Sequence, residues 1–200
     1  MGNIIINVGR QFGSGGYLVA RSLGDKLGIP VYDRELISEA ARRSGFSAEL
    51  FASKDEKRSL FGMSGFIGTG RASFSGNYVN DDSIFKIQSD VIRMIADNGP
   101  AIFIGRCADY ILRDRPDVLR VFIHADMEER IKRITEVYKI NDSDPEKLLH
   151  QKDKRRAAYY QFYTDIKWGD TKNFHITLDS SAFGIEKCVE ILKTLYLGEK

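Results

Sequence analysis

The feature that most constrains this 200-residue chain is a glycine-rich loop directly after a short apolar run near the N-terminus. The run, residues 3–8 (Asn-Ile-Ile-Ile-Asn-Val), is typical of a strand buried on both faces of a sheet. The loop, residues 9–16 (Gly-Arg-Gln-Phe-Gly-Ser-Gly-Gly), follows it, and apolar residues then recur at helical spacing over 18–27. A buried strand, a glycine loop and a helix predict the beginning of a parallel α/β fold.

The same alternation continues along the chain. Four further strands are predicted at 30–33, 101–104, 118–123 and 174–178. Helices are predicted over 84–95 and 185–196, after Asp144 with Pro145 at the first position, and after Asp126 with Glu129 completing a capping box. Five strands alternating with helices predict a five-stranded parallel sheet with helices on both faces. In such sheets ligands bind beyond the carboxyl ends of the strands.

Charge and cysteine content exclude several classes of protein. The chain has 30 Lys and Arg against 28 Asp and Glu, a net charge of +2, which is too balanced for a broad nucleic-acid-binding surface. No apolar run approaches the roughly 18 residues of a membrane span. Cys107 and Cys188 are far apart, which argues against a disulfide scaffold and fits the cytoplasm. We expect one cytoplasmic domain over 1–200 with no nucleic-acid or membrane partner; no feature fixes its oligomeric state.

The glycine loop itself is typical of a phosphate site, because backbone N–H groups and the following helix N-terminus both attract anions. A dinucleotide pattern GxGxxG would use Gly13 and Gly15 but needs a third glycine where the chain has Leu18. A nucleotide P-loop, GxxxxGK[ST], fits in length with Arg10 at its first position and Gly16 at the lysine position. A plain tight turn between strand and helix is the third alternative.

Several segments together resemble the cytidylate-kinase-like family of P-loop proteins, a branch of the nucleoside monophosphate kinases. These are 10–16 (Arg-Gln-Phe-Gly-Ser-Gly-Gly), 27–37 (Leu-Gly-Ile-Pro-Val-Tyr-Asp-Arg-Glu-Leu-Ile), 104–106 (Ile-Gly-Arg), 153–160 (Asp-Lys-Arg-Arg-Ala-Ala-Tyr-Tyr) and 178–186. The resemblance covers almost the whole chain and is least over 45–80.

This resemblance implies a P-loop nucleotide-kinase fold with an acceptor-binding insertion over 34–97 and a basic lid over 138–170. It implies transfer of the ATP γ-phosphoryl group, with Mg²⁺, to a nucleoside monophosphate, CMP first among the candidates. The Gly- and Ser-rich segment 62–76 is expected to close over the acceptor. A nucleotide-binding regulatory module without catalysis is the alternative, and an NAD-binding oxidoreductase is disfavoured by Leu18 and by the lid.

The resemblance also implies roles for individual residues. The donor phosphates would lie on the loop residues Gly13, Ser14, Gly15, Gly16 and Tyr17. The acceptor would be held by Asp33, Arg106, Arg130 and Arg133. The transferring group would meet Arg10, Arg106 and the lid residues Asp153 and Arg156.

The loop departs from the family pattern at two positions. Gly16 stands where common monophosphate kinases carry a lysine, and Tyr17 stands where they carry a hydroxyl for magnesium. We expect Arg10, Arg21 or a cation of the lid to supply the missing charge. Ser14 or water would complete the magnesium shell, and no metal site made of protein ligands alone is expected.

Overall fold

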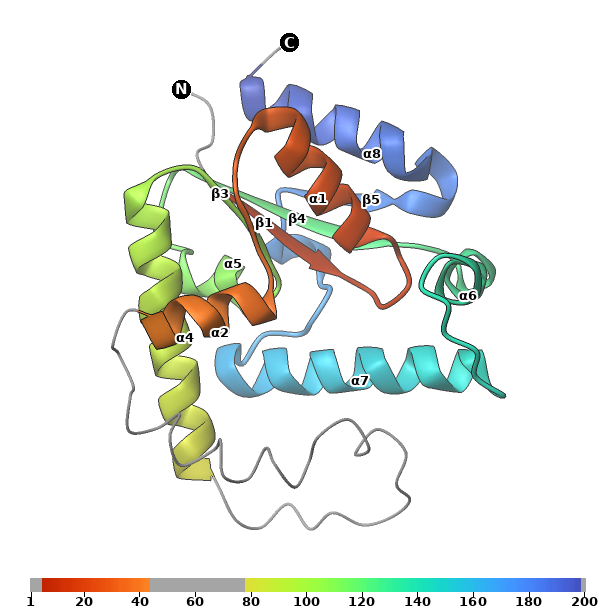
Figure 1. Ribbon diagram of the computed structural model, residues 1–200, viewed down its shortest axis with the longest axis horizontal. Coiled ribbons are helices and arrows are strands. Elements are labelled where there is room, and N and C mark those ends of the chain that lie inside the picture. Colours follow the sequence, from red (N-terminus) through yellow and green to blue (C-terminus); the bar gives the residue numbers. More distant parts are fainter. Residues whose placement is uncertain (1–4, 44–77, 199–200) are drawn as a thin grey trace.

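The computed structural model describes residues 5–43 and 78–198, which form a central sheet covered by helices (Figure 1). Its strands are β1 Ile5–Arg10, β2 Val31–Tyr32, β3 Ala101–Ile104, β4 Val118–His124 and β5 Ile176–Asp179. All pair in parallel, in the order β2-β3-β1-β4-β5. The predicted five-stranded parallel sheet is therefore confirmed, and each strand lies at the apolar run that predicted it.

Helices connect the strands on both faces of the sheet. They are α1 Gly16–Leu27, α2 Arg34–Arg43, α4 Tyr78–Asn98, α5 Ala108–Ile111, α6 Met127–Glu136, α7 Pro145–Thr164, α8 Ser180–Leu197 and the short 3-10 helix η1 Thr171–Asn173. Within the described part of the chain, no helix is both long enough and apolar enough to span a bilayer. Much of the expected acceptor-binding insertion, including the segment 62–76, lies outside the described residues.

Alternate strand residues point to opposite faces, which explains why the strands read as continuous apolar runs. On one face, Ile6 and Val8 of β1 pack against α1 and α8, which lie side by side in Figure 1. On the other face, Ile5 and Phe103 pack with apolar residues of α2, α4 and α5. Both faces are thus buried, as the sequence pattern requires.

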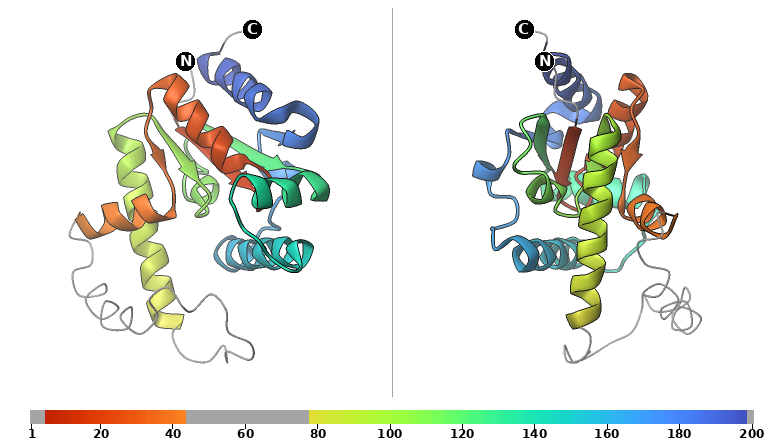
Figure 2. Two further views of the ribbon diagram at one scale, coloured as in Figure 1. Left: turned by 45° about the vertical axis from the view of Figure 1, so that its right-hand side comes forward. Right: turned by 90° about the vertical axis from the view of Figure 1, so that its left-hand side faces the viewer.

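Helix α7 lies at the edge of the sheet where ligands bind in parallel α/β folds. In Figure 1 the strand β1 points toward α7, and in both views of Figure 2 α7 lies below the strands with α8 above them. The chain leaving β1 passes directly over α7, since the Phe12 N–H donates to Asp153 Oδ1 of α7 at 2.7 Å. The glycine loop and α7 are therefore direct neighbours.

Two helix starts test the predicted capping signals. Asp144 caps α7 as predicted, because its Oδ1 accepts from the Lys147 N–H at 3.0 Å and Pro145 follows it. The capping box predicted at Asp126 is wrong, although α6 does begin directly after this residue. The Asp126 side chain makes no capping hydrogen bond; instead its backbone N–H donates to Ser181 Oγ at 2.7 Å. A hydroxyl from α8 therefore anchors this turn.

Candidate active site

The glycine loop between β1 and α1 has the backbone of an anion cradle. Gly13 and Gly15 adopt left-handed conformations, with φ of 80° and 78°, which favour glycine at both positions. Gly15 is the N-cap residue of α1, and no side chain among the described residues caps this helix end. The first N–H groups of α1 therefore face outward with the positive end of the helix dipole, where an anion binds favourably.

Side chains from α6 and α7 fix the backbone of this loop. Arg130 Nε donates to the Phe12 carbonyl at 2.8 Å, and its guanidinium pairs with Asp153, which in turn accepts the Phe12 N–H. Arg133 donates to the Gly13 carbonyl at 2.8 Å. The family resemblance implies substrate contacts for Arg130 and Arg133 and a catalytic contact for Asp153. In the structure these three side chains contact the loop backbone or one another, and the Arg130 side chain is only 5% exposed; their expected contacts with nucleotide stay predictions.

Ser14 is held inside the loop, and its expected contact with donor phosphates or magnesium stays a prediction. Its side chain is buried, and its hydroxyl donates to the Gln11 carbonyl at 3.0 Å within the loop. The Ser14 carbonyl accepts from the Ser180 hydroxyl at 2.6 Å. The hydroxyl therefore faces the interior of the loop, and Ser14 is not among the residues that line the cavity next to it.

Two cavities meet above the carboxyl edge of the sheet. The larger, which we call the arginine cavity, has a volume of about 320 Å³. Its walls carry the cations Arg10, Arg34, Arg106, Arg155 and Arg156 and the aromatic residues Tyr159, Tyr160, Trp168 and Phe174. The smaller, the loop cavity, has a volume of about 210 Å³. It is lined by Arg10, Gln11, Phe12, Gly13, Gly15, Gly16, Tyr17, Tyr138 and Arg156. Arg10 and Arg156 line both cavities.

Arg10, the last residue of β1, fits between two glycines. A Cβ atom on Gly16 would lie 2.5 Å from Arg10 Cβ, and a Cβ atom on Gly105 would lie 2.2 Å from Arg10 Nη1. Both distances are far below van der Waals contact. The side chain of Arg10 thus passes through space that is open only because neither neighbour carries a side chain. Gly16, at the lysine position of the common loop pattern, makes room for a different cation.

The charge of Arg10 has no ion-pair partner in the part of the chain that the structure describes. Burial, and then the charges of Arg156 and Arg106, lower the pKa of Arg10 to about 9, while Asp33 acts in the opposite direction. Among the described residues the Arg10 guanidinium makes no hydrogen bond and no ion pair. Burial also lowers the pKa of Arg156, whose guanidinium donates to the Arg10 carbonyl at 2.8 Å. The boundary between the two cavities is therefore strongly positive and suited to an anion.

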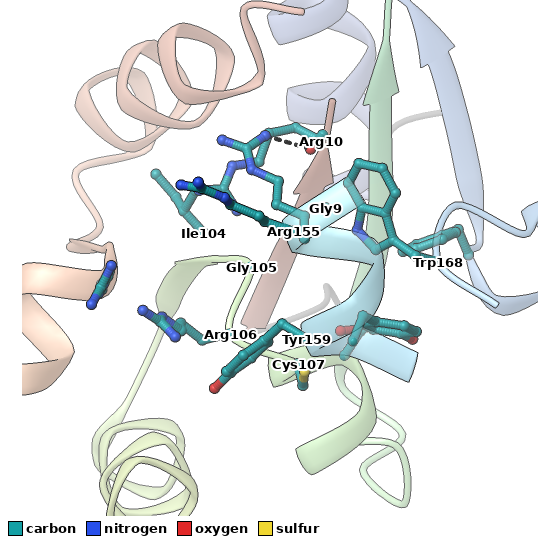
Figure 3. Close-up of a pocket in the computed structure, with 14 residues that line it drawn as sticks. Gly9, Arg10, Ile104, Gly105, Arg106, Cys107, Arg155, Tyr159 and Trp168 are labelled. Carbon is teal, nitrogen blue, oxygen red and sulfur yellow. Dashed lines mark hydrogen bonds between the residues drawn. The ribbon is translucent and has the colours of Figure 1, made fainter. Parts of the chain in front are cut away.

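Arg106 enters the arginine cavity from the turn after β3, as its place beyond a strand end predicts. Figure 3 shows Arg106 with Arg10 and Arg155, which reach the same cavity from β1 and α7. The Arg106 guanidinium lies over the Tyr159 ring, 5.1 Å from its centroid. Asp33 lies at the start of α2, where its carboxylate accepts the N–H groups of Glu35 and Leu36. Its expected contact with an acceptor stays a prediction.

Arg34 had no predicted role, and Arg155 was expected only as one cation of the basic lid; both line the arginine cavity. Arg34 follows the predicted strand 30–33 directly, so its place beyond a strand end was a usable signal. Arg155 lies beside Arg156 in the basic run of α7, and both line the cavity, with Arg155 the more exposed of the two. The expected lid over 138–170 corresponds largely to α7, which is docked on the loop here; its opening and closing stays a prediction.

Comparisons with known proteins agree with this architecture. The model of the cytidylate kinase-like family matches residues 5–182. A cytidylate kinase from Methanosarcina barkeri is 26% identical over 185 residues, which cover 90% of this chain and 89% of that protein. The crystal structure of an uncharacterized protein from Eubacterium ventriosum has a TM-score of 0.73 at 26% identity, covering 98% of this chain and 99% of the other. A gluconokinase from Sinorhizobium meliloti shares the fold, with a TM-score of 0.55 at 14% identity and coverage of 98% and 95%. The expected P-loop kinase fold is confirmed.

Proposed function

This chain belongs to the cytidylate kinase-like family, and from that premise we propose that it transfers the ATP γ-phosphoryl group to a nucleoside monophosphate, with CMP as the first candidate. The observation that carries the proposal is the sharing of Arg10 and Arg156 by the two cavities. Phosphoryl transfer needs donor and acceptor held in line and the developing negative charge neutralised. A boundary lined by two arginines between two anion-binding spaces meets that need. The ligands we propose are small nucleotides.

In this proposal the donor phosphates lie in the loop cavity, on the N–H groups at the start of α1. Arg10 supplies the charge that a lysine supplies in related kinases. Arg106 holds the acceptor phosphate in the arginine cavity, since a guanidinium can grip a phosphate with two parallel hydrogen bonds. Asp153, Arg130 and Arg133 keep the loop in shape and do not touch the transferred group.

Magnesium would arrive with ATP rather than in a site of protein ligands. Among the described residues, no group of three or more His, Cys, Asp or Glu side chains could hold a metal ion. Mg²⁺ in kinases is commonly bound through phosphate oxygens and water with few protein ligands. The lining of the loop cavity fits that arrangement, because its backbone N–H groups and Arg10 would bind phosphate oxygens and no carboxylate is among its described lining residues.

The alternative is a nucleotide-binding module without catalysis, and Gly16 is the observation that favours it. A chain lacking the P-loop lysine could bind phosphates on its backbone and still not activate them. Arg10 argues for catalysis, because a cation that lines both cavities, and that pairs with no acid among the described residues, would serve little purpose in a module that only binds the donor.

The test is ADP release measured with ATP, Mg²⁺ and a panel of monophosphates: CMP, UMP, AMP and GMP. The kinase proposal expects turnover with at least one of them, and Arg106→Ala should lower kcat/KM for that acceptor by about 10²–10³-fold. Arg113→Ala is the matched control, because this exposed arginine stacks on Tyr110 outside both cavities and should retain activity. ATP binding without turnover of any monophosphate would contradict the kinase and support the binding module.

A further inference from the structure

The turn that carries Arg106 has a strained backbone. Gly105, Arg106 and Cys107 all adopt left-handed conformations, with φ of 69°, 58° and 55°. Glycine tolerates this region, but Arg106 and Cys107 bring a Cβ atom too close to a carbonyl oxygen. Two consecutive residues of this kind persist only where the surrounding structure holds them in place. Contacts with neighbouring elements must therefore hold this turn.

A buried hydrogen bond between α5 and α7 lies directly behind the turn. The Tyr160 hydroxyl donates to Asp109 Oδ2 at 2.6 Å, and the two side chains are almost fully buried. Asp109 stands in the first turn of α5, two residues after Cys107, and the N–H groups of Tyr110 and Ile111 in the same turn donate to the Cys107 carbonyl at 3.0 and 2.8 Å. The Asp109 carboxylate thus joins α5 to a side chain of α7.

Tyr159, the residue before Tyr160 in α7, contacts the side chain of Arg106. Tyr159 stacks under the Arg106 guanidinium, while Tyr160 reaches the helix that begins at the end of the turn. Both tyrosines line the arginine cavity with Arg106. Adjacent residues of one helix therefore hold the side chain of Arg106 and the backbone that carries it.

We propose that Asp109 and Tyr160 are positioning residues, which hold the strained turn so that Arg106 meets the acceptor phosphate. The effect on acceptor binding rests on the proposed function, whereas the stabilisation of the turn by Asp109 and Tyr160 does not. Because α7 also contacts the donor loop through Asp153 and Arg156, it fixes the acceptor arginine relative to the donor site. A loss of the Tyr160 hydroxyl should therefore weaken acceptor binding selectively.

Tyr160→Phe is the direct test, because it removes the hydroxyl and keeps the ring. In native-state hydrogen exchange, residues 105–112 should exchange at least about tenfold faster, while residues 5–10 change by less than about twofold. The KM for CMP, or for the accepted monophosphate, should rise about tenfold, with the KM for ATP within about twofold. Asp109→Asn keeps an oxygen that can accept from Tyr160, so its effects should be smaller. Tyr196→Phe, on α8 at the opposite face, is the matched control.

Several outcomes separate this inference from its alternatives. Unchanged exchange over 105–112, or equal changes in the KM for ATP and for the acceptor, would overturn it and assign the pair a general packing role. If the wild-type protein turns over no monophosphate, the proposed function fails on its own. The exchange comparison then decides alone whether Asp109 and Tyr160 hold the turn.

Discussion

Replacing Arg10 by methionine is expected to stabilise the ligand-free protein and at the same time to remove its affinity for phosphates. The Arg10 guanidinium is enclosed with Arg106 and Arg156 and has no hydrogen-bond partner among the described residues. A cation held in this way opposes folding, because burial and like charges disfavour its charged form. Methionine keeps a flexible chain of similar width between Gly16 and Gly105 without the charge.

The size of the effect follows from the pKa of Arg10, which burial and the neighbouring arginines lower to about 9. At about 1.4 kcal/mol per pKa unit, the difference from an ordinary arginine corresponds to about 5 kcal/mol of unfavourable free energy at pH 7. Solvent screening and the packing lost with the guanidinium reduce the expected gain in unfolding free energy to about 1–3 kcal/mol. Because the pKa of Arg10 is lower in the folded state, the charge of Arg10 destabilises the folded protein fully below pH 9. This destabilisation decreases as the pH rises through 9.

Urea unfolding at pH 7 without ligand measures the gain, and thermal unfolding with increasing inorganic pyrophosphate measures the affinity. The wild-type midpoint should rise with pyrophosphate, because a ligand that binds only the folded state stabilises it, whereas the Arg10→Met midpoint should not move. Arg21→Met, at an exposed position of α1, is the control and should keep the pyrophosphate response. If Arg10→Met lowers the unfolding free energy, or retains the response, Arg10 is not an uncompensated cation that binds phosphate.

Three further predictions concern stability and reactivity. Asp153→Ala should lower the unfolding free energy by about 3–5 kcal/mol, because it leaves the guanidinium of Arg130 buried without its carboxylate partner. A loss below about 1 kcal/mol in urea unfolding would show that Asp153 and Arg130 hold the loop only weakly. Asn7→Leu should stabilise the protein by about 1–2 kcal/mol, since neither polar atom of the buried amide has a partner in the described structure; calorimetric melting checks this, and a lower midpoint would contradict it. Cys107, whose pKa burial raises to about 12, and Cys188 should resist thiol reagents at pH 8 until the protein unfolds, so rapid labelling of the native protein would refute the burial of both thiols.

The fold could be predicted from the sequence wherever burial leaves a periodic signal. The strand β1 is apolar on both faces because both faces are covered, and Asp144 with Pro145 marks the start of α7 through purely local chemistry. Short elements escaped prediction. The four residues of α5 are too few for a helical stripe, and α2 directly follows a strand without a separate apolar pattern. The predicted helix over 84–95 is also shorter than α4, because an apolar stripe marks a helical face and carries no signal for where the helix ends.

The site was predictable in its ligand chemistry and only partly in its residue roles. The glycine positions follow from local backbone demands, and Arg106 follows from its place after a strand. The roles of Arg130 and Asp153 depend on contacts with Phe12 from 118 and 141 positions away, which no local pattern contains. A cation that fixes a loop and a cation that binds a phosphate look alike in a sequence; only the neighbouring carbonyl and carboxylate distinguish them.

The close packing of Arg10 against Gly16 has a consequence for how such a loop could change over evolution. A lysine introduced at position 16 alone would place its Cβ atom 2.5 Å from Arg10 Cβ, so it would collide before its own amine could be used. Loss of Arg10 alone would leave the donor site without this cation. An arginine at the end of the strand and a lysine at the start of the helix are therefore two ways to place a cation at the donor site. Either single substitution on the way from one to the other gives a protein that is worse than both. Searches that require the lysine pattern will pass over every chain that adopted the arginine solution.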